Sequence, residues 1–206
     1  MDHLQDPRAV IVAMHHCATR DLLGLMDGFY SNLEDGLFEL SFRTRSEDKH
    51  RQYFDLMRQM RHSKSRLITL FIDQLQTSMR DWFDDENPAM SQAGERQARI
   101  LAQKSAAHYQ GILTQLAERS NFATGRDVNA TELPISPLKV AYHFLCSCRE
   151  LKFDEHGIEV VQELFGRFVL ERLGSVYGQC QQDLKKAGYM TLLEQALLEQ
   201  KAEEQD

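Results

Sequence analysis

The sequence predicts an all-α protein, an elongated antiparallel bundle of about five or six helices. Apolar residues recur at spacings of three and four over two long stretches, residues 8–44 and 46–83, which is the period of a helix with one buried face. Only four prolines and eleven glycines occur in 206 residues, so long helices meet few breakers. No stretch reads as a convincing strand. We therefore expect a single helical domain over residues 1–206, built on the pair 8–44 and 46–83.

The first long helix is predicted to begin at Asp6-Pro7 and to end near Thr44. A carboxylate at the N-cap followed by proline at the first helical position is a frequent helix start. Glycine costs about 1 kcal/mol against alanine inside a helix. Close helix–helix contact or a local bend is therefore expected at the three glycines of this helix, which are Gly24, Gly28 and Gly36.

The second long helix is predicted to begin after Ser46, a good N-cap residue, with Glu47 and Asp48 near the positive end of the helix dipole. At 1.5 Å per residue it would extend for roughly 55 Å, and such a length needs a partner helix along most of it. Since only a short joint at residues 44–46 separates the two long helices, the first is expected to be that partner, running antiparallel.

The remainder of the chain predicts further helices around this pair. A third helix is expected to start at Asn87-Pro88 and to continue past Leu116. Residues 121–135 are rich in Thr, Asn, Asp and Gly and are predicted to form a mobile loop or hinge. A short helix should start at Ser136-Pro137. A fifth helix should carry one apolar row from Ile158 to Leu184 and end at Gly188, and an amphipathic segment should follow it.

The charge is unevenly distributed along the chain. The net charge of −7 argues against general nucleic-acid binding, which needs a basic surface, so no DNA partner is expected. Residues 43–66 nevertheless carry eight Lys or Arg against three acidic residues, a local net of +5, and the rest of the chain sums to −7 − 5 = −12. This segment is the first candidate for a functional surface.

Several classes of protein are disfavoured by the sequence. No apolar run approaches the roughly 20 residues needed to cross a bilayer, and the N-terminus lacks the pattern of a signal peptide, so we expect a cytoplasmic protein without membrane insertion. The four scattered cysteines fit reduced thiols better than a disulfide framework.

Two patches of the sequence resemble a bacterial family of uncharacterised proteins, domain-of-unknown-function family 1631. The first comprises LFEL at residues 37–40 and YFDLMRQMR at residues 53–61, and the second runs from Ser136-Pro137 to Gly188. The resemblance implies a regulatory setting, because some relatives are associated with PilZ-type domains that bind cyclic-di-GMP. The PilZ motif itself is absent, so the resemblance assigns that ligand to no residue here.

Catalytic and metal-binding motifs give little support for an enzyme. His143, Cys146 and Cys148 could supply metal ligands, but residues 146 and 148 point about 200° apart on a helix, so ordinary packed side chains are the preferred interpretation. Glu47-x-x-His50 is half of a di-iron pattern, and no second copy occurs. Nucleophile, phosphate-loop and dinucleotide motifs are missing as well. We expect a protein that is not an enzyme and has no metal or cofactor.

The basic segment 43–66 is expected to bind an acidic partner. The preferred function is a non-enzymatic regulatory or adaptor module that acts by protein–protein contact, with self-association as one form of it. The alternative is a sensor in which the arginines hold an anionic nucleotide such as cyclic-di-GMP and Tyr53 or Phe54 stacks on a base. Pairing of these charges within the chain is the third interpretation. The candidate residues are Arg43, Arg45, Lys49, Arg51, Tyr53, Arg58 and Arg61.

The C-terminal amphipathic segment, residues 189–199, is the second candidate surface. An apolar row on a terminal helix can dock in the groove of a partner, or it can cover the protein's own core. The residues predicted to contact a partner helix are Met190, Leu193 and Leu197.

Overall fold

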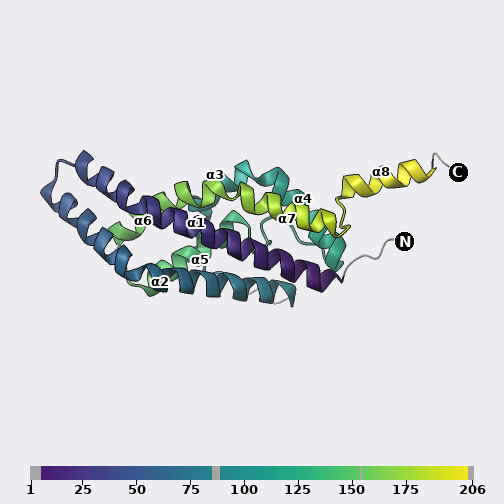
Figure 1. Ribbon diagram of the computed structural model, residues 1–206, viewed down its shortest axis with the longest axis horizontal. Helices are drawn as coiled ribbons and strands as arrows, with labels where there is room; N and C mark the ends of the chain where they lie inside the picture. Colours follow the sequence, from purple (N-terminus) through teal and green to yellow (C-terminus); the bar gives the residue numbers. More distant parts are fainter. Residues whose placement is uncertain (1–5, 85–88, 154, 204–206) are drawn as a thin grey trace.

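The computed structural model describes residues 6–84, 89–153 and 155–203, and the described residues are predominantly helical without a strand (Figure 1). The all-α prediction is confirmed, with more helices than expected. In chain order they are α1 (Pro7–Arg43), α2 (Glu47–Phe83), α3 (Gln92–His108), α4 (Gln110–Thr124), α5 (Pro137–Glu150), α6 (Glu155–Phe168), the 3₁₀ turn η1 (Leu170–Arg172), α7 (Gly174–Lys186) and α8 (Leu192–Glu203).

The two longest helices form the antiparallel hairpin that the sequence predicts. Their predicted caps are present: the Asp6 side chain accepts a hydrogen bond from the Arg8 backbone N–H at 3.1 Å, and Ser46 accepts one from that of Lys49 at 3.4 Å. Thr44 has an extended backbone (φ −80°, ψ 140°), which ends α1 and turns the chain into α2. One apolar row of each helix is buried over nearly its full length, so the hairpin is an integral part of the core.

The other helices pack around this hairpin. α1 contacts α2 and also α4, α6 and α7, whereas α5 contacts α2 and is covered by α3. In Figure 1 the bend between α1 and α2 projects at one end of the elongated bundle, and α8 projects at the opposite end.

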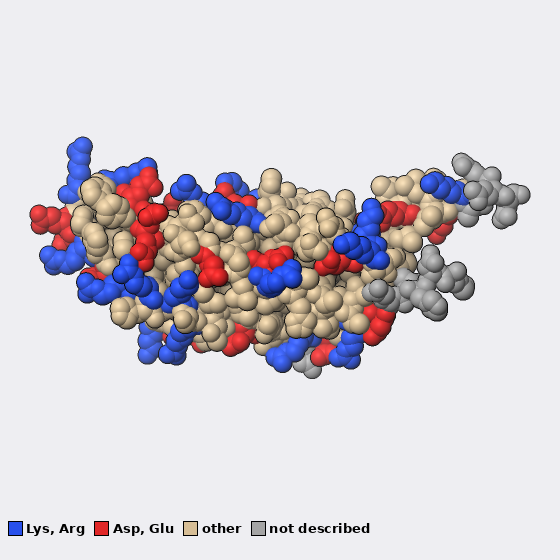
Figure 2. All heavy atoms as spheres, viewed as in Figure 1, with Lys and Arg blue, Asp and Glu red and all other residues tan. Residues whose placement is uncertain are grey.

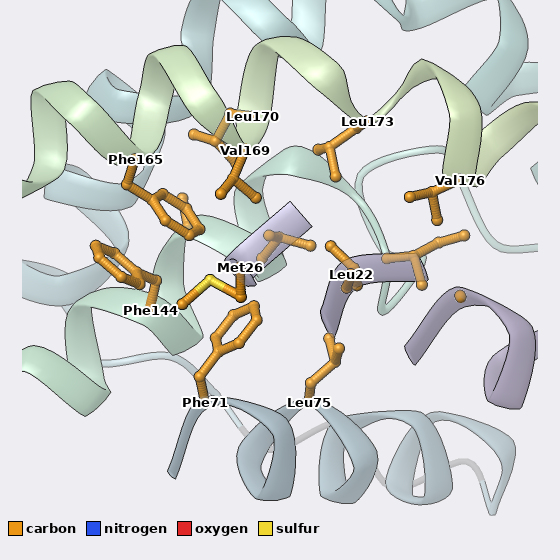
Figure 3. Close-up of a cluster of buried hydrophobic side chains, with 14 of the residues drawn as sticks. Leu22, Met26, Phe71, Leu75, Phe144, Phe165, Val169, Leu170, Leu173 and Val176 are labelled. Carbon is orange, nitrogen blue, oxygen red and sulfur yellow. The ribbon is translucent and has the colours of Figure 1, made fainter. Parts of the chain in front are cut away.

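Four buried phenylalanines join four helices at the centre of the core. Phe144 of α5 and Phe165 of α6 stack face to face, with ring centroids 3.7 Å apart and an interplanar angle of 8°. Phe29 of α1 and Phe71 of α2 meet that stack edge-on at 5.9–6.4 Å, a favourable arrangement for aromatic rings. Figure 3 shows Phe71, Phe144 and Phe165 converging on this cluster, with Leu and Val side chains continuing the core toward α7.

The structure divides two predicted helices, and one contact lies at both breaks. The expected third helix ends at His108, and Tyr109 (φ −97°, ψ 8°) separates α3 from α4. Its expected start at Asn87-Pro88 lies outside the described residues, and α3 is capped by Ser91. The predicted row from Ile158 to Leu184 divides at η1. The Tyr109 hydroxyl donates to the Glu171 carbonyl oxygen in η1 at 2.6 Å, so a tertiary contact connects the two breaks.

The predicted hinge at residues 121–135 is shorter than expected, because α4 continues to Thr124 and ends at Gly125, whose φ of 70° is left-handed. The side chain of Asn121 exchanges two hydrogen bonds of 3.0 Å with the backbone of Val128. Leu133 and Ile135 are buried. This stretch is therefore fastened to the bundle by hydrogen bonds and by apolar side chains.

The predicted C-cap glycine is confirmed at the end of α7. Gly188 has φ 87°, its N–H donates to the Lys185 carbonyl, and the next N–H, of Tyr189, donates to the Leu184 carbonyl, both at 3.1 Å. Only glycine adopts this conformation without steric cost, so the chain turns here before α8 begins.

Alanine substitutions at two helical glycines are expected to have opposite effects. A Cβ at Gly24 would meet no atom within 4 Å, so Gly24→Ala should raise the free energy of unfolding by about 1 kcal/mol through helix propensity. A Cβ at Gly94 would lie 2.8 Å from Tyr142 Cε2 of α5, so Gly94→Ala should lower the free energy of unfolding by about 1–2 kcal/mol. Urea unfolding of both variants measures the difference, and equal changes in the two variants would contradict it.

Candidate interaction surface at the hairpin tip

The segment 43–66 lies where α1 turns into α2, at the projecting end of the hairpin. Beneath its surface the two helices share a buried seam that extends close to the bend. Leu37 and Ser41 of α1 and Tyr53, Leu56 and Met60 of α2 are all buried. Side chains on the outside of the tip are therefore carried by two helices packed against each other.

Three of the eight basic residues form ion pairs with acidic residues of α1. Arg61 makes a two-pronged contact with Glu34, with nitrogen–oxygen distances of 2.9 and 2.7 Å. The hydrogen bonds of this pair lower the pKa of Glu34 and raise that of Arg61. Lys64 Nζ lies 3.3 Å from an Asp27 carboxylate oxygen. The third pair is Arg43 with Glu39.

The other basic residues of the tip remain exposed. Within the described part of the chain no ion pair is formed by the other five, and all of them are exposed: Arg45, Lys49, Arg51, Arg58 and Arg66. Figure 2 shows lysine and arginine side chains crowded around this end of the molecule, with acidic side chains between them. Ion pairs within the described chain thus account for three of the eight basic residues and leave five cations available.

Three large aromatic side chains are exposed beside these cations. The exposed fractions are 49% for Phe38, 70% for Phe42 and 38% for Phe54. The rings of Phe38 and Phe42 lie against each other with centroids 4.6 Å apart, and the ring of Phe54 lies 4.9 Å from that of His50. Tyr53 is buried, so of the two residues predicted to stack on a base only Phe54 faces outward.

One ion pair and the helical period place these aromatic and basic side chains on a common face. The Glu34–Arg61 contact shows which side of α1 and which side of α2 face the same way. Side chains three or four residues apart follow one another along a helix face. The side marked by that contact, here called the tip face, therefore carries Phe38, Phe42, Phe54 and Arg58, with Arg61 at its inner end.

An open groove of about 610 Å³ lies next to the tip face. It begins at the joint, where Thr44 and Ser46 line it, and continues along α2 as far as Arg58. Three arginines, two aromatic rings and two acidic residues line it: Arg45, Arg51, Arg58, His50, Phe54, Glu47 and Asp55.

The predicted C-terminal surface is also present. Leu193 and Leu197 of α8 are 70% and 47% exposed, and Leu192 is 65% exposed, whereas Met190 is partly buried at the base of the helix. Packing of α8 over the core, the alternative that the sequence left open, is not observed for these leucines. They lie on the helix that projects from the end of the bundle opposite the hairpin tip (Figure 1).

Sequence reasoning missed the residue that positions α8. Arg119 of α4 is only 4% exposed, and its guanidinium donates to Gln181 Oε1 and Glu194 Oε1, both at 2.8 Å, and to the Tyr189 carbonyl. Glu194 and Thr191 also form a capping box across the first turn of α8, with bonds of 2.9 and 3.3 Å. The pKa of Glu194 falls to about 2 through the Arg119 contact and the Thr191 N–H. The T-x-x-E spacing at residues 191–194 was the available signal.

The other chemically notable side chains do not assemble a site. Among the described residues no three His, Cys, Asp or Glu side chains are arranged to hold a metal ion. Cys148 is buried, and burial raises the pKa of its thiol and that of Cys146. Burial lowers the pKa of His143 to about 4. In the described chain, no helix has the length and apolar character required to span a membrane.

Comparison with known proteins gives one match. No curated protein and no solved structure matches the chain. A family model described as "Protein of unknown function (DUF1631) N-terminal domain" matches residues 6–188. The matched range includes the hairpin and every helix from α1 to α7, and it ends before α8. The chain therefore belongs to this family, as the two resembling patches of its sequence predict.

Proposed function

We propose that the protein is a non-enzymatic regulatory or adaptor module whose hairpin tip binds an acidic surface of a protein partner. The observation that carries the proposal is the tip face, where three exposed phenylalanines share one side of the hairpin with Arg58 and Arg61 above a buried seam. Aromatic residues and arginine are enriched in protein–protein interfaces and supply much of their binding energy. Exposed lysines and arginines around them attract an acidic partner and orient it.

The arrangement of the tip also supports binding without large rearrangement. Since both helices are packed along the seam, the aromatic and basic groups are already held on one side before a partner arrives. Pre-organised groups lose less conformational entropy on binding, which leaves more of the contact energy for affinity. Arg51 and Arg58 are exposed and line the groove together with Phe54, and a charge reversal at these two residues should have the largest effect.

Affinity capture from cells that express the chain natively tests this function. Arg51→Glu combined with Arg58→Glu is expected to reduce recovery of specific partners at least about tenfold, a change of about 1.4 kcal/mol. The matched control is Arg80→Glu with Arg96→Glu, which changes the net charge equally at two exposed arginines outside the basic segment 43–66. Equal recovery of partners by both double variants would contradict the proposal. The proposal would also be contradicted if every protein captured by the parent chain were captured equally well by the tip variant.

A second candidate function is supported by the groove beside the tip face. Three arginines surround an exposed phenylalanine there, a combination that suits the phosphates and a base of an anionic nucleotide such as cyclic-di-GMP. Titration calorimetry with cyclic-di-GMP separates the two functions. Saturable heat that disappears in Arg45→Ala and in Arg51→Ala would favour the sensor, and absence of heat would leave the adaptor.

A further inference from the structure

The molecule carries exposed apolar side chains at two opposite ends. At one end the phenylalanines of the tip face are exposed, and at the other the leucines of α8 are exposed (Figure 1). In α8 the positions 192, 193, 196 and 197 fall on one side of the helix and are occupied by Leu, Leu, Ala and Leu. Both ends thus present an apolar surface of the kind that proteins usually cover with a partner.

The α8 surface is held in place at its base. The buried Arg119 guanidinium binds Glu194 in the first turn of α8 and the Tyr189 carbonyl just before it. The Gly188 turn and the Thr191–Glu194 capping box fix where the helix starts. The start of α8 is therefore anchored to the bundle while its leucine row stays exposed. An amphipathic helix of this kind can lay its apolar face on a partner.

The charges at the two ends are opposite. Residues 189–206 contain five acidic residues and one lysine, a net of −4, with Glu194 engaged by Arg119. Residues 43–66 have a net of +5, and five of their cations make no ion pair within the described chain. The C-terminal segment, acidic in sequence and with a leucine row on α8, therefore complements a basic surface with exposed phenylalanines in charge and in apolar character.

We propose that α8 of one copy of this chain docks on the tip face of a second copy. The proposal rests on the proposed function of the hairpin tip and names its acidic partner. Because tip and α8 lie at opposite ends, the contact forms between copies and not within one. It is a head-to-tail interface with different surfaces on its two sides, so each added copy leaves a free tip at one end and a free α8 at the other.

Sedimentation velocity over a concentration series tests the assembly with two variants of the full chain. Phe42→Ser with Arg58→Glu alters the tip, and Leu193→Ser with Leu197→Ser alters α8. The parent should form oligomers that grow with concentration and dissociate at high salt, and each variant should be monomeric. Val12→Ser with Ile100→Ser, at two exposed apolar residues elsewhere, is the control and should assemble like the parent. Circular dichroism verifies that all four chains fold.

Mixing the two variants distinguishes this interface from other modes of association. The tip variant retains an intact α8 and the α8 variant retains an intact tip, so their mixture should give a 1:1 dimer that grows no further. A parent chain that stays monomeric up to about 1 mM would overturn the inference, since Kd values above that correspond to a binding free energy of less than about 4 kcal/mol. Association lost only in the α8 variant, or a mixture that stays monomeric, would overturn it as well.

Failure of this inference is distinguishable from failure of the proposed function. If the chain is monomeric and the tip still captures another acidic protein in the affinity experiment, the tip functions as an interaction surface and only the second copy is the wrong partner. If neither assembly nor tip-dependent capture occurs, both proposals fall.

Discussion

Phe165→Ala is expected to lower the free energy of unfolding by about 3–5 kcal/mol, the range for truncating a fully buried phenylalanine. Phe165 has no exposed surface and stacks on Phe144 at 3.7 Å while Phe29 and Phe71 meet the pair edge-on. The truncation removes a ring that touches α1, α2 and α5 at once, and those helices cannot all move inward to fill the space. Since a domain of this kind is stable by about 5–15 kcal/mol, the loss is a large fraction of the total.

The matched control for this substitution is Phe42→Ala. The Phe42 ring is 70% exposed and lies against Phe38 in the preceding turn of α1, so its removal should change stability by less than about 1 kcal/mol. Urea unfolding followed by circular dichroism gives both values. If the two variants unfolded at the same urea concentration, the aromatic cluster would not be the centre of the core.

The long hairpin could be predicted because its signals are local. Asp6-Pro7 and Ser46 are cap residues next to the helices they start, and the apolar rows of α1 and α2 repeat over ten turns each. The Gly188 turn is equally local, since a left-handed residue after a helix favours glycine whatever surrounds it. For these elements neighbouring residues carry the information, and the tertiary structure agrees with them.

The breaks at Tyr109 and in η1 could not be predicted, because their cause is tertiary. The apolar rows through both breaks retain helical spacing, and the bond that joins them connects Tyr109 with Glu171, 62 residues later. The surroundings of the glycines in α1 are also set by tertiary contacts that the local sequence does not reveal. A Cβ at Gly36 would approach Leu164 Cδ2 of α6 to 3.0 Å, whereas Gly24 and Gly28 have open space, and the sequence treats all three alike.

The charge of the candidate site could be predicted, but its shape could not. Composition alone identified residues 43–66, yet which cations were neutralised depended on acidic residues of α1 that lie opposite them, as Glu34 lies opposite Arg61. The outward position of Phe54 and the burial of Tyr53 depend on the seam between the helices. The spacing of four between Phe38 and Phe42 was visible, but exposure of both follows only once α1 is paired with α2.

Lowering the pH from 7 to 5 is expected to destabilise the protein by roughly 2 kcal/mol through His15 alone. His15 lies in α1, 7% exposed, with its ring edge-on to Trp82 at 5.9 Å, and its buried Nε2 has no hydrogen-bond partner among the described residues. Burial, with a smaller contribution from His16, lowers its pKa from 6.5 to about 4. The unfolded chain therefore binds a proton in this range while the folded chain does not.

The pH range in which stability is lost distinguishes the effect of the buried histidine from the effect of the ion-paired carboxylates. A histidine with a lowered pKa favours the folded state above pH 6.5 and loses that contribution as the pH falls toward about 4. The ion-paired Glu34 and Glu194 also have lowered pKa values, but their contributions are present above 4.5 and are lost only below it. His143, whose pKa is about 4, adds to the first effect. Stability between pH 7 and 5 therefore reports mainly on the buried histidines.

His15→Leu tests this assignment, with His16→Leu at the exposed neighbouring position as its control. The urea midpoint of His15→Leu should fall less between pH 7 and 5 than that of the parent, by an amount corresponding to roughly 2 kcal/mol, whatever its stability at pH 7. The control should retain most of the parent's slope, because burial is the larger cause of the lowered pKa of His15 and His16 the smaller. An unchanged slope in His15→Leu would mean that His15 accepts a proton inside the folded hairpin. In that case the seam between α1 and α2 next to Trp82 would have to admit water or a polar partner.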